Sequence, residues 1–202
     1  SNRSSIGGHL ECSTSGGATG LVESCEFVDG AVTRSERFGP LDEAAGGAIQ
    51  ASLTHGGVLV VRDCGFEACN STDVGGAISC RQPREDLRQR CLEGTYVCRR
   101  GSLQLEDCSF TRCAAPRGGA IVWSYEDGLD IDGCLFESCV ALSGGAILAD
   151  AGEHRIVNSE FTQCTAIGQS GGGLWLGTCL AVLEETWFVE CAATNSNGGA
   201  IQ

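Results

Sequence analysis

Cysteine is the residue type in this 202-residue sequence with the greatest capacity for chemistry, since the chain contains 14 of them. Nine of these cysteines stand at two fixed distances from a recurring phenylalanine. The two sets are Cys25, Cys64, Cys108 and Cys134, two residues before it, and Cys69, Cys113, Cys139, Cys164 and Cys191, three residues after it. Thiols in such a pattern can form disulfides, pack as small apolar side chains or bind a metal ion.

A high and even cysteine count favours an oxidising compartment and disulfides over a set of reduced core thiols. Zinc binding is less favoured, because the Cys-x4-Cys spacing follows the repeat and no histidine accompanies it. If equivalent positions lie one strand spacing apart, bonds between neighbouring repeats are feasible. The expected pairs are Cys25–Cys64, Cys108–Cys134, Cys69–Cys113 and Cys139–Cys164, with pairing within a repeat, as in Cys64–Cys69, left open.

The cysteines belong to a repeat of about 27 residues whose second mark is Gly-Gly-Ala-Ile. This mark begins at Gly46, Gly75, Gly118, Gly144 and Gly198, with looser copies at Gly7 and Gly171. Between the two marks, apolar and polar residues alternate, as in Ser-Leu-Gln-Leu-Glu at 102–106. Alternation predicts strands, and a fixed period of this length predicts a solenoid.

The sequence therefore predicts an all-β fold, a right-handed parallel β-helix of about six coils with roughly 27 residues per coil. We expect one domain over residues 1–202, as a fragment or processed part of a longer chain. Residues 79–101 are expected to form an insertion in the third coil. Gly-Gly would allow a bend and a close approach of neighbouring coils, while the phenylalanines would stack about 4.8 Å apart.

The recurring Gly-Gly-Ala-Ile, together with Phe-x-x-Cys, resembles the repeats of the chlamydial polymorphic membrane proteins, which carry Phe-x-x-Asn at the second mark. This resemblance covers nearly all of the chain at the level of motifs. It implies a β-helical fold and a role at a cell surface, because the repeat regions of that family are surface adhesins. Cysteine in place of asparagine is the departure from the family pattern.

The formal charge of −13, with arginine as the only strong base, argues against nucleic acid and against an anionic membrane as partners. No apolar run approaches the roughly 18 residues of a membrane span. The insertion departs from this acidic character, since it holds six of the arginines, among them Arg84, Arg88 and Arg90, beside Cys80, Cys91 and Cys98. It could recognise an acidic partner or a neighbouring copy; a solvated loop tied by a disulfide is the alternative.

A second candidate contact surface is a stripe formed by Val122, Leu148 and Trp175. Strand alternation places these residues opposite an apolar column and therefore on the outside. Exposed apolar stripes usually mark contact surfaces. The alternative is that alternation slips near the glycine pair or that a loop covers them.

Asn2 and Asn70 begin glycosylation sequons, which suit a secreted chain. For an enzyme, the best carboxylate group is Asp130 and Asp132 with Glu106, which could serve calcium binding or acid–base chemistry. An exposed polar strand face explains these residues more simply, and the catalytic motifs of pectin lyases and polygalacturonases are absent. We therefore expect a non-enzymatic extracellular adhesion or scaffold module without cofactor. Its partners would be other extracellular proteins, further copies or glycans; a carbohydrate-active or carbohydrate-binding β-helix is the alternative.

Overall fold

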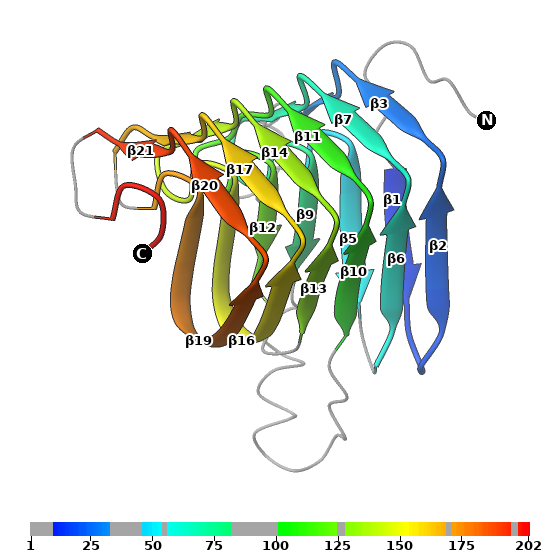
Figure 1. Ribbon diagram of the computed structural model, residues 1–202. Helices are drawn as coiled ribbons and strands as arrows, with labels where there is room; N and C mark the ends of the chain where they lie inside the picture. Colours follow the sequence, from blue (N-terminus) through cyan, green and yellow to red (C-terminus); the bar gives the residue numbers. More distant parts are fainter. Residues whose placement is uncertain are drawn as a thin grey trace.

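The computed structural model describes residues 10–32, 46–53, 56–81, 101–124, 128–168, 171–194 and 198–202. This part of the chain is all-β, with strands joined by short bends and no helix. Every pairing between its strands is parallel. Equivalent strands of successive repeats therefore lie side by side (Figure 1).

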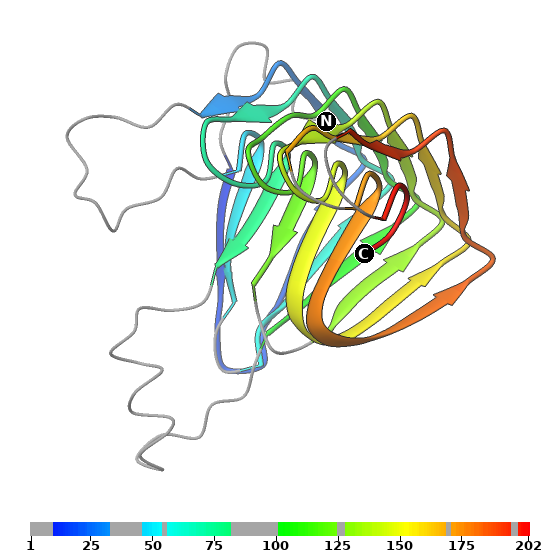
Figure 2. The same ribbon diagram turned by 90° about the vertical axis from the view of Figure 1, so that its left-hand side faces the viewer.

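Each repeat contributes strands to three walls that enclose a common interior (Figure 2). The first wall contains β1 (Leu10–Thr14), β5 (Ile49–Leu53), β9 (Ile78–Arg81), β12 (Ile121–Trp123) and the beginnings of β16 (Ile147–Val157) and β19 (Leu174–Glu184). The second wall contains β2 (Thr19–Glu23), β6 (Val58–Arg62), β10 (Ser102–Glu106), β13 (Leu129–Asp132) and the ends of β16 and β19. Because β16 and β19 run from one wall into the other, these two walls form a single 10-stranded sheet that folds back on itself.

The third wall is a six-stranded sheet that carries the phenylalanines. Its strands are β3 (Glu26–Val28), β7 (Gly65–Glu67), β11 (Ser109–Thr111), β14 (Leu135–Glu137), β17 (Glu160–Thr162) and β20 (Trp187–Val189). Shorter strands follow it and lead toward the next Gly-Gly pair: β4 (Ala31–Val32), β8 (Asn70–Ser71), β15 (Val140–Ala141), β18 (Thr165–Ala166) and β21 (Ala192–Ala193).

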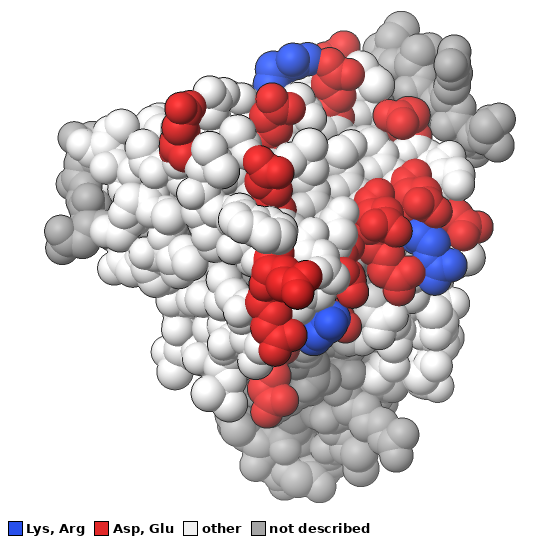
Figure 3. Space-filling view, viewed as in Figure 1, with Lys and Arg blue, Asp and Glu red and all other residues white. Residues whose placement is uncertain are grey.

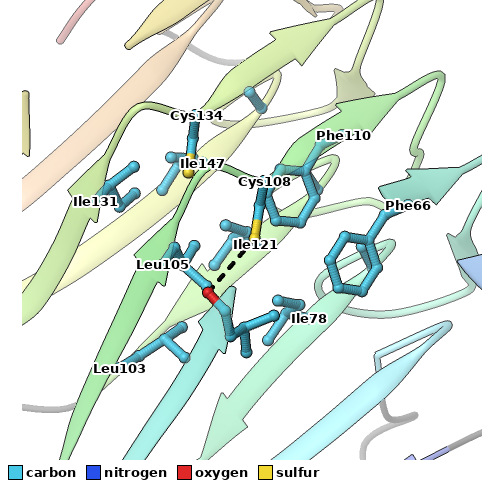
Figure 4. Close-up of a cluster of buried hydrophobic side chains, with 14 of the residues drawn as sticks. Phe66, Ile78, Leu103, Leu105, Cys108, Phe110, Ile121, Ile131, Cys134 and Ile147 are labelled. Carbon is cyan, nitrogen blue, oxygen red and sulfur yellow. Dashed lines mark hydrogen bonds between the residues drawn. The ribbon is translucent and has the colours of Figure 1, made fainter. Parts of the chain in front are cut away.

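The interior is a set of columns in which one residue of each repeat packs on its equivalent. The phenylalanine column has ring centroids 4.6 to 4.8 Å apart and rings within 11° of parallel, from Phe27 to Phe188. In the first wall, the fully buried Trp123 lies between Cys80 and Ala149, whose small side chains leave room for the indole. Figure 4 shows that aliphatic and aromatic side chains of several repeats fill this space together. Apolar burial of this kind is the main stabilising contribution to such a fold.

The corners on either side of the phenylalanine strand use a single residue in the left-handed region of φ. Before the strand this residue is Ser24, Asp63, Asp107, Gly133, Asn158 or Glu185, and after it Asp29, Ala68, Arg112, Ser138, Gln163 or Glu190. Their φ values lie between 45° and 65°. Each repeat therefore has two sharp turns. The residue that follows each turn is a cysteine, or the residue that takes the place of cysteine in that repeat, and the turn sets its orientation.

At the corner before the first wall, the second glycine of each pair lies against the next repeat. A Cβ built on Gly119 would stand 2.1 Å from the carbonyl oxygen of Gly145, a distance that no real side chain adopts. The preceding Gly118 has φ of 54°. The expectation that the glycine pair combines a bend with a close approach is thus confirmed.

The prediction of an all-β fold with stacked parallel strands is confirmed, and the arrangement is compatible with the predicted solenoid. The boundary of the insertion needs correction, because residues 79–81 belong to β9 and pair with β5 and β12. Residues 82–100 lie outside the described part of the chain. That the whole chain forms one domain stays a prediction.

Candidate functional site: the thiol columns and the outer faces

The first thiol column runs through the corner between the second and third walls. Strand register places Cys25 beside Cys64, Cys64 beside Cys108, and Cys108 beside Cys134. The same register continues the column to Ser159 and Thr186, which stand two residues before their own phenylalanines. Sequence reasoning missed these two residues because it followed cysteine alone; their spacing from Phe161 and Phe188 was the available signal.

Side chains of this column share one hydrogen-bonding role. The Cys108 thiol donates to the carbonyl of Glu106 at 3.2 Å and to that of Val61 at 3.4 Å, the contact drawn in Figure 4. The Thr186 hydroxyl likewise donates to a carbonyl two residues before it and to one in the preceding repeat. From Cys64 onward, the carbonyl two residues before each of these side chains also accepts a backbone N–H from the preceding repeat, so the column adds a second donor to that carbonyl.

The second thiol column contains cysteines alone and lies just after the phenylalanine strand. Its members are Cys69, Cys113, Cys139, Cys164 and Cys191, which are held in register by the strand pairs on both sides. Each of these thiols donates to the carbonyl of the preceding repeat's phenylalanine, over 3.2 to 3.6 Å. The first repeat has Gly30 at this position, and a Cβ built there would lie 3.2 Å from the Cys69 sulfur. The column thus begins at Cys69.

Exposure distinguishes the ends of these columns from their middles. In the second column the first four thiols are fully buried, whereas Cys191 is half-buried. In the first column Cys25 is half-buried and the other three thiols are buried. These two half-buried thiols belong to the first and the last of the repeats that the structure describes.

The predicted disulfides are not present, since all twelve described cysteines are free thiols. The register nevertheless places the two members of each expected pair in adjacent repeats, so that the proximity on which the prediction rested is confirmed. Cys80 differs, because its column neighbours are Ala51 and Trp123 and the nearest cysteine of that column, Cys12, lies two repeats away. The other two candidates, Cys91 and Cys98, lie outside the described residues.

Thiol–thiol contacts govern the acidity of the second column. Hydrogen bonding to the Cys113 thiol, then to the Cys164 thiol, together with burial, raises the pKa of Cys139 well above its ordinary value. Hydrogen bonding to Cys164, followed by burial, also raises the pKa of Cys191. Side-chain hydrogen bonding with Cys139, then with Cys191, lowers the pKa of Cys164 in spite of its burial.

The predicted outer stripe is aligned as expected but is less exposed. Val122, Leu148 and Trp175 lie side by side in register on the first wall. Val122, however, is only 4% exposed, and the other two residues are half-buried. The expectation of a freely exposed apolar stripe is therefore wrong at Val122. Alternation predicts the direction of a side chain, but not what packs over it.

The carboxylates considered for catalysis or calcium are matched to arginines of neighbouring repeats. Arg155 reaches Asp130 at 3.0 Å and Asp132 at 3.7 Å, while Arg62 reaches Glu106 at 2.7 Å. These residues form charged rows on the outside of the second wall. Among the described residues, no group of three or more His, Cys, Asp or Glu side chains is arranged to hold a metal ion.

The remaining candidates divide between the surface and the undescribed segments. Asn70 is exposed at the start of β8, and its side-chain amide donates to the carbonyl of Ala68 at 2.8 Å. The insertion arginines Arg84, Arg88 and Arg90 and the second sequon at Asn2 lie outside the described residues. Of the predictions about the two sequons and the insertion arginines, the structure therefore bears only on the accessibility of Asn70.

His154 is a buried polar residue that sequence reasoning did not single out. It occupies an inward column between Leu129 and Ala181 and is 3% exposed. Neither ring nitrogen has a hydrogen-bond partner of ordinary geometry. Burial lowers the pKa of His154, an effect that the nearby backbone of Ala151 and Glu153 offsets only in part. Its alignment with Leu103 and Leu129 was the signal that it faces the core.

Comparison of the chain with protein-family models, with curated proteins and with solved structures gives no match in any of the three. The described residues contain no helix of the length and hydropathy that crossing a membrane requires. The arrangement of the repeats and their outer faces are the features of the chain that bear on its function.

Proposed function

We propose that the chain is a right-handed parallel β-helix that acts outside the cell as a non-enzymatic adhesion or scaffold module. The carrying observation is the in-register stacking of equivalent residues through every wall. Such stacking makes a regular framework whose outer faces display rows of side chains at the strand spacing. The right hand is supported by the strong preference of parallel crossover connections for that hand. The resemblance to surface adhesin repeats supports the extracellular setting.

The outer faces of the second and third walls form an acidic face (Figure 3). It comprises Glu23, Glu26, Glu67, Glu106, Asp130, Asp132, Glu137, Glu160, Glu184 and Glu190. Only Arg62, Arg112 and Arg155 of the described residues offset this charge on the same walls. A surface of this sign favours a partner with a basic patch, whose encounter it would steer. Within the sequence, the arginine-rich insertion offers such a patch for contacts between copies.

Carbohydrate binding is the second candidate function, favoured by one specific observation. Trp187 stands on the outer side of the third wall and is 58% exposed. A solvent-exposed indole can pack its apolar face against a sugar ring, as aromatic side chains do at recognition surfaces. This candidate requires binding at Trp187 and not at the acidic face.

Attachment and turnover assays separate these functions. The chain is coupled to beads through its N-terminus and offered to cultured cells, to basic extracellular proteins, to a second preparation of itself and to a panel of polysaccharides. Attachment that weakens as salt rises, without depolymerisation of any polysaccharide, is the expected result. A variant with Glu67, Glu137 and Glu160 changed to glutamine should attach less strongly, while Trp187→Ala should behave as the unchanged chain.

Each alternative outcome has a definite meaning. Depolymerisation of a polysaccharide would overturn the non-enzymatic proposal. Glycan attachment that Trp187→Ala abolishes, and that the glutamine variant retains, would favour carbohydrate binding instead. Attachment that neither salt nor either variant affects would exclude both the acidic face and Trp187 as the contact surface.

A further inference from the structure

The buried part of the second thiol column keeps one side-chain orientation through four successive repeats. Each sulfur lies 3.4 to 3.6 Å from the phenylalanine carbonyl oxygen of the preceding repeat, and 3.6 to 3.8 Å from the carbonyl oxygen two residues before it. The four residues are Cys69, Cys113, Cys139 and Cys164. All four are fully buried, and each has a described repeat on both sides. Their surroundings therefore do not depend on either end of the chain.

The separation of neighbouring sulfurs follows from this uniform orientation. Side chains that share one orientation on strands in register are displaced from one another by the strand spacing, about 4.8 Å. The phenylalanine rings of the same four repeats, which stand three residues before these cysteines, show that displacement directly, with centroids 4.6 to 4.8 Å apart. Neighbouring sulfurs of the column therefore lie in a row, about one strand spacing apart.

This separation matches a metal ion that is held between two thiolates on opposite sides. A metal–thiolate bond is about 2.3 Å long, so that two such bonds in line span about 4.6 Å. Three sulfurs in a row cannot surround one ion. In agreement, the described repeats contain no group of three or more His, Cys, Asp or Glu side chains that could hold a metal. The geometry therefore suits an ion with two ligands and disfavours zinc, which takes four.

We propose that pairs of neighbouring thiols in the two thiol columns bind copper(I), with one ion between the sulfurs of two successive repeats. Thiolates are the ligands that select copper(I), a soft monovalent ion that is stable with two sulfurs in line. The best-supported site lies between Cys113 and Cys139, which have a fully buried thiol on either side. This binding goes beyond the adhesion function proposed above and does not depend on it.

Binding exchanges protons for the ion. Two thiols each lose the S–H proton to solvent as the two copper–sulfur bonds form, so that copper keeps its oxidation state and the bound unit carries one negative charge. An S–H group is a weak hydrogen-bond donor, so that the carbonyl contacts given up are weak as well. On either side of Cys113 and Cys139, the thiols of Cys69 and Cys164 can donate to the two thiolates and stabilise the buried charge.

The first thiol column repeats this arrangement among its buried members. Cys64, Cys108 and Cys134 lie in register, and each sulfur is 3.0 to 3.4 Å from the carbonyl oxygen two residues before it. Ser159 occupies the position in the next repeat, but its hydroxyl does not supply the soft ligand that copper(I) selects. We expect an ion between two neighbouring cysteines of this column as well, which provides a second and independent site for the test.

Two double variants separate the adjacency of the thiols from their number. Cys113→Ser with Cys164→Ser leaves Cys69, Cys139 and Cys191 two repeats apart, which is too far for one ion to bridge; we call it the alternating variant. Cys69→Ser with Cys164→Ser keeps Cys113 beside Cys139, and we call it the paired variant. Both variants lose two cysteines and leave all the others unchanged, so that copper bound elsewhere on the chain contributes equally to each.

Because the sulfurs of this site are buried, the ion is supplied while the chain folds. Each variant is unfolded in urea with a phosphine reductant under argon and refolded with excess copper(I), and loosely held copper is then removed with a coloured copper(I) chelator. The paired variant should retain one copper ion per chain more than the alternating variant. X-ray absorption should assign two sulfur neighbours to that additional copper.

Circular dichroism establishes whether each variant is folded, and the first column decides the matter if a variant of the second is not. Cys64→Ser with Cys134→Ser leaves Cys25 and Cys108 two repeats apart, whereas Cys25→Ser with Cys64→Ser keeps Cys108 beside Cys134. Serine already occupies this position at Ser159, where its hydroxyl donates to the equivalent carbonyl. The same difference of one copper ion per chain is expected between these two variants.

The overturning results are equally specific. Equal amounts of copper in folded paired and alternating variants would show that neighbouring thiols do not form the site. Three or four sulfur neighbours around the additional copper would contradict an ion held in line between two repeats. Additional copper that appears only together with the loss of the β-sheet signal would assign the binding to unfolded chain and exclude a site built by the fold.

Discussion

The Cys134 backbone N–H donates a hydrogen bond of 3.1 Å to the hydroxyl of Ser159, which takes the place of cysteine in the following repeat. Ser159 in turn donates to the carbonyl two residues before it at 2.6 Å, as the Cys134 thiol does to its own equivalent carbonyl at 3.4 Å. The corner therefore requires a small hydrogen-bond donor at this position, and a hydroxyl meets that requirement as well as a thiol does.

The first prediction concerns this interchange at Cys134. Replacing Cys134 by serine should change the free energy of unfolding by less than about 1 kcal/mol, because the donor is kept. Replacing it by alanine should cost about 1–3 kcal/mol, since the hydrogen bond is lost and a small cavity is left. Urea unfolding in the presence of reductant measures both changes. Equal losses for serine and alanine would show that the hydrogen bond is unimportant.

A second prediction separates a steric clash from backbone strain at glycine. Gly119→Ala should destabilise the fold by about 3 kcal/mol or more, because the added Cβ meets the Gly145 carbonyl oxygen at 2.1 Å. Gly17→Ala is the matched control: φ there is 77° and nothing lies within 4 Å of the added Cβ. Its cost should be limited to the strain of a left-handed alanine, about 1–2 kcal/mol. Thermal unfolding that ranks the two variants in the reverse order would contradict the close packing of the glycine corners.

The third prediction follows from the packing of Trp123 in the first wall. Trp123→Ala should cost about 3–5 kcal/mol, because the indole is fully buried between two small residues. Trp187→Ala should change stability by less than about 0.5 kcal/mol, since that side chain is largely exposed. Iodide should quench the fluorescence of Trp187 and leave that of Trp123 unaffected. Strong quenching of Trp123 would mean that the interior is open to solvent.

Much of this architecture could be predicted from sequence because the repeat provides many equivalent observations of each position. The alternation, the phenylalanine column and the glycine corners were each predicted in that way. What the repeat could not predict is the burial of Val122 and the unpaired state of the thiols. It also concealed Ser159 and Thr186, because they share the position of the cysteines without sharing their residue type.

The fourth prediction is a dependence of stability on pH that arises from His154. Burial lowers the pKa of this histidine in the folded chain, while its pKa in the unfolded chain lies near 6.5. As pH falls below 6.5, the unfolded chain binds a proton that the folded chain does not, so that the free energy of unfolding decreases. The decrease amounts to about 1.4 kcal/mol for each pH unit and ends below the folded-state pKa, where both forms are protonated.

His154→Leu tests this assignment, because leucine is the residue of the two preceding repeats in the same column. The variant should be at least as stable as the unchanged chain at pH 8, and its advantage should grow as the pH is lowered from 7 to 5. Urea midpoints at several pH values measure that difference directly. The acidic face contributes equally to both proteins, so the comparison isolates the histidine. A constant difference between the two proteins over this range would mean that His154 titrates alike in the folded and unfolded chains, and that the buried imidazole is not the source of the pH dependence.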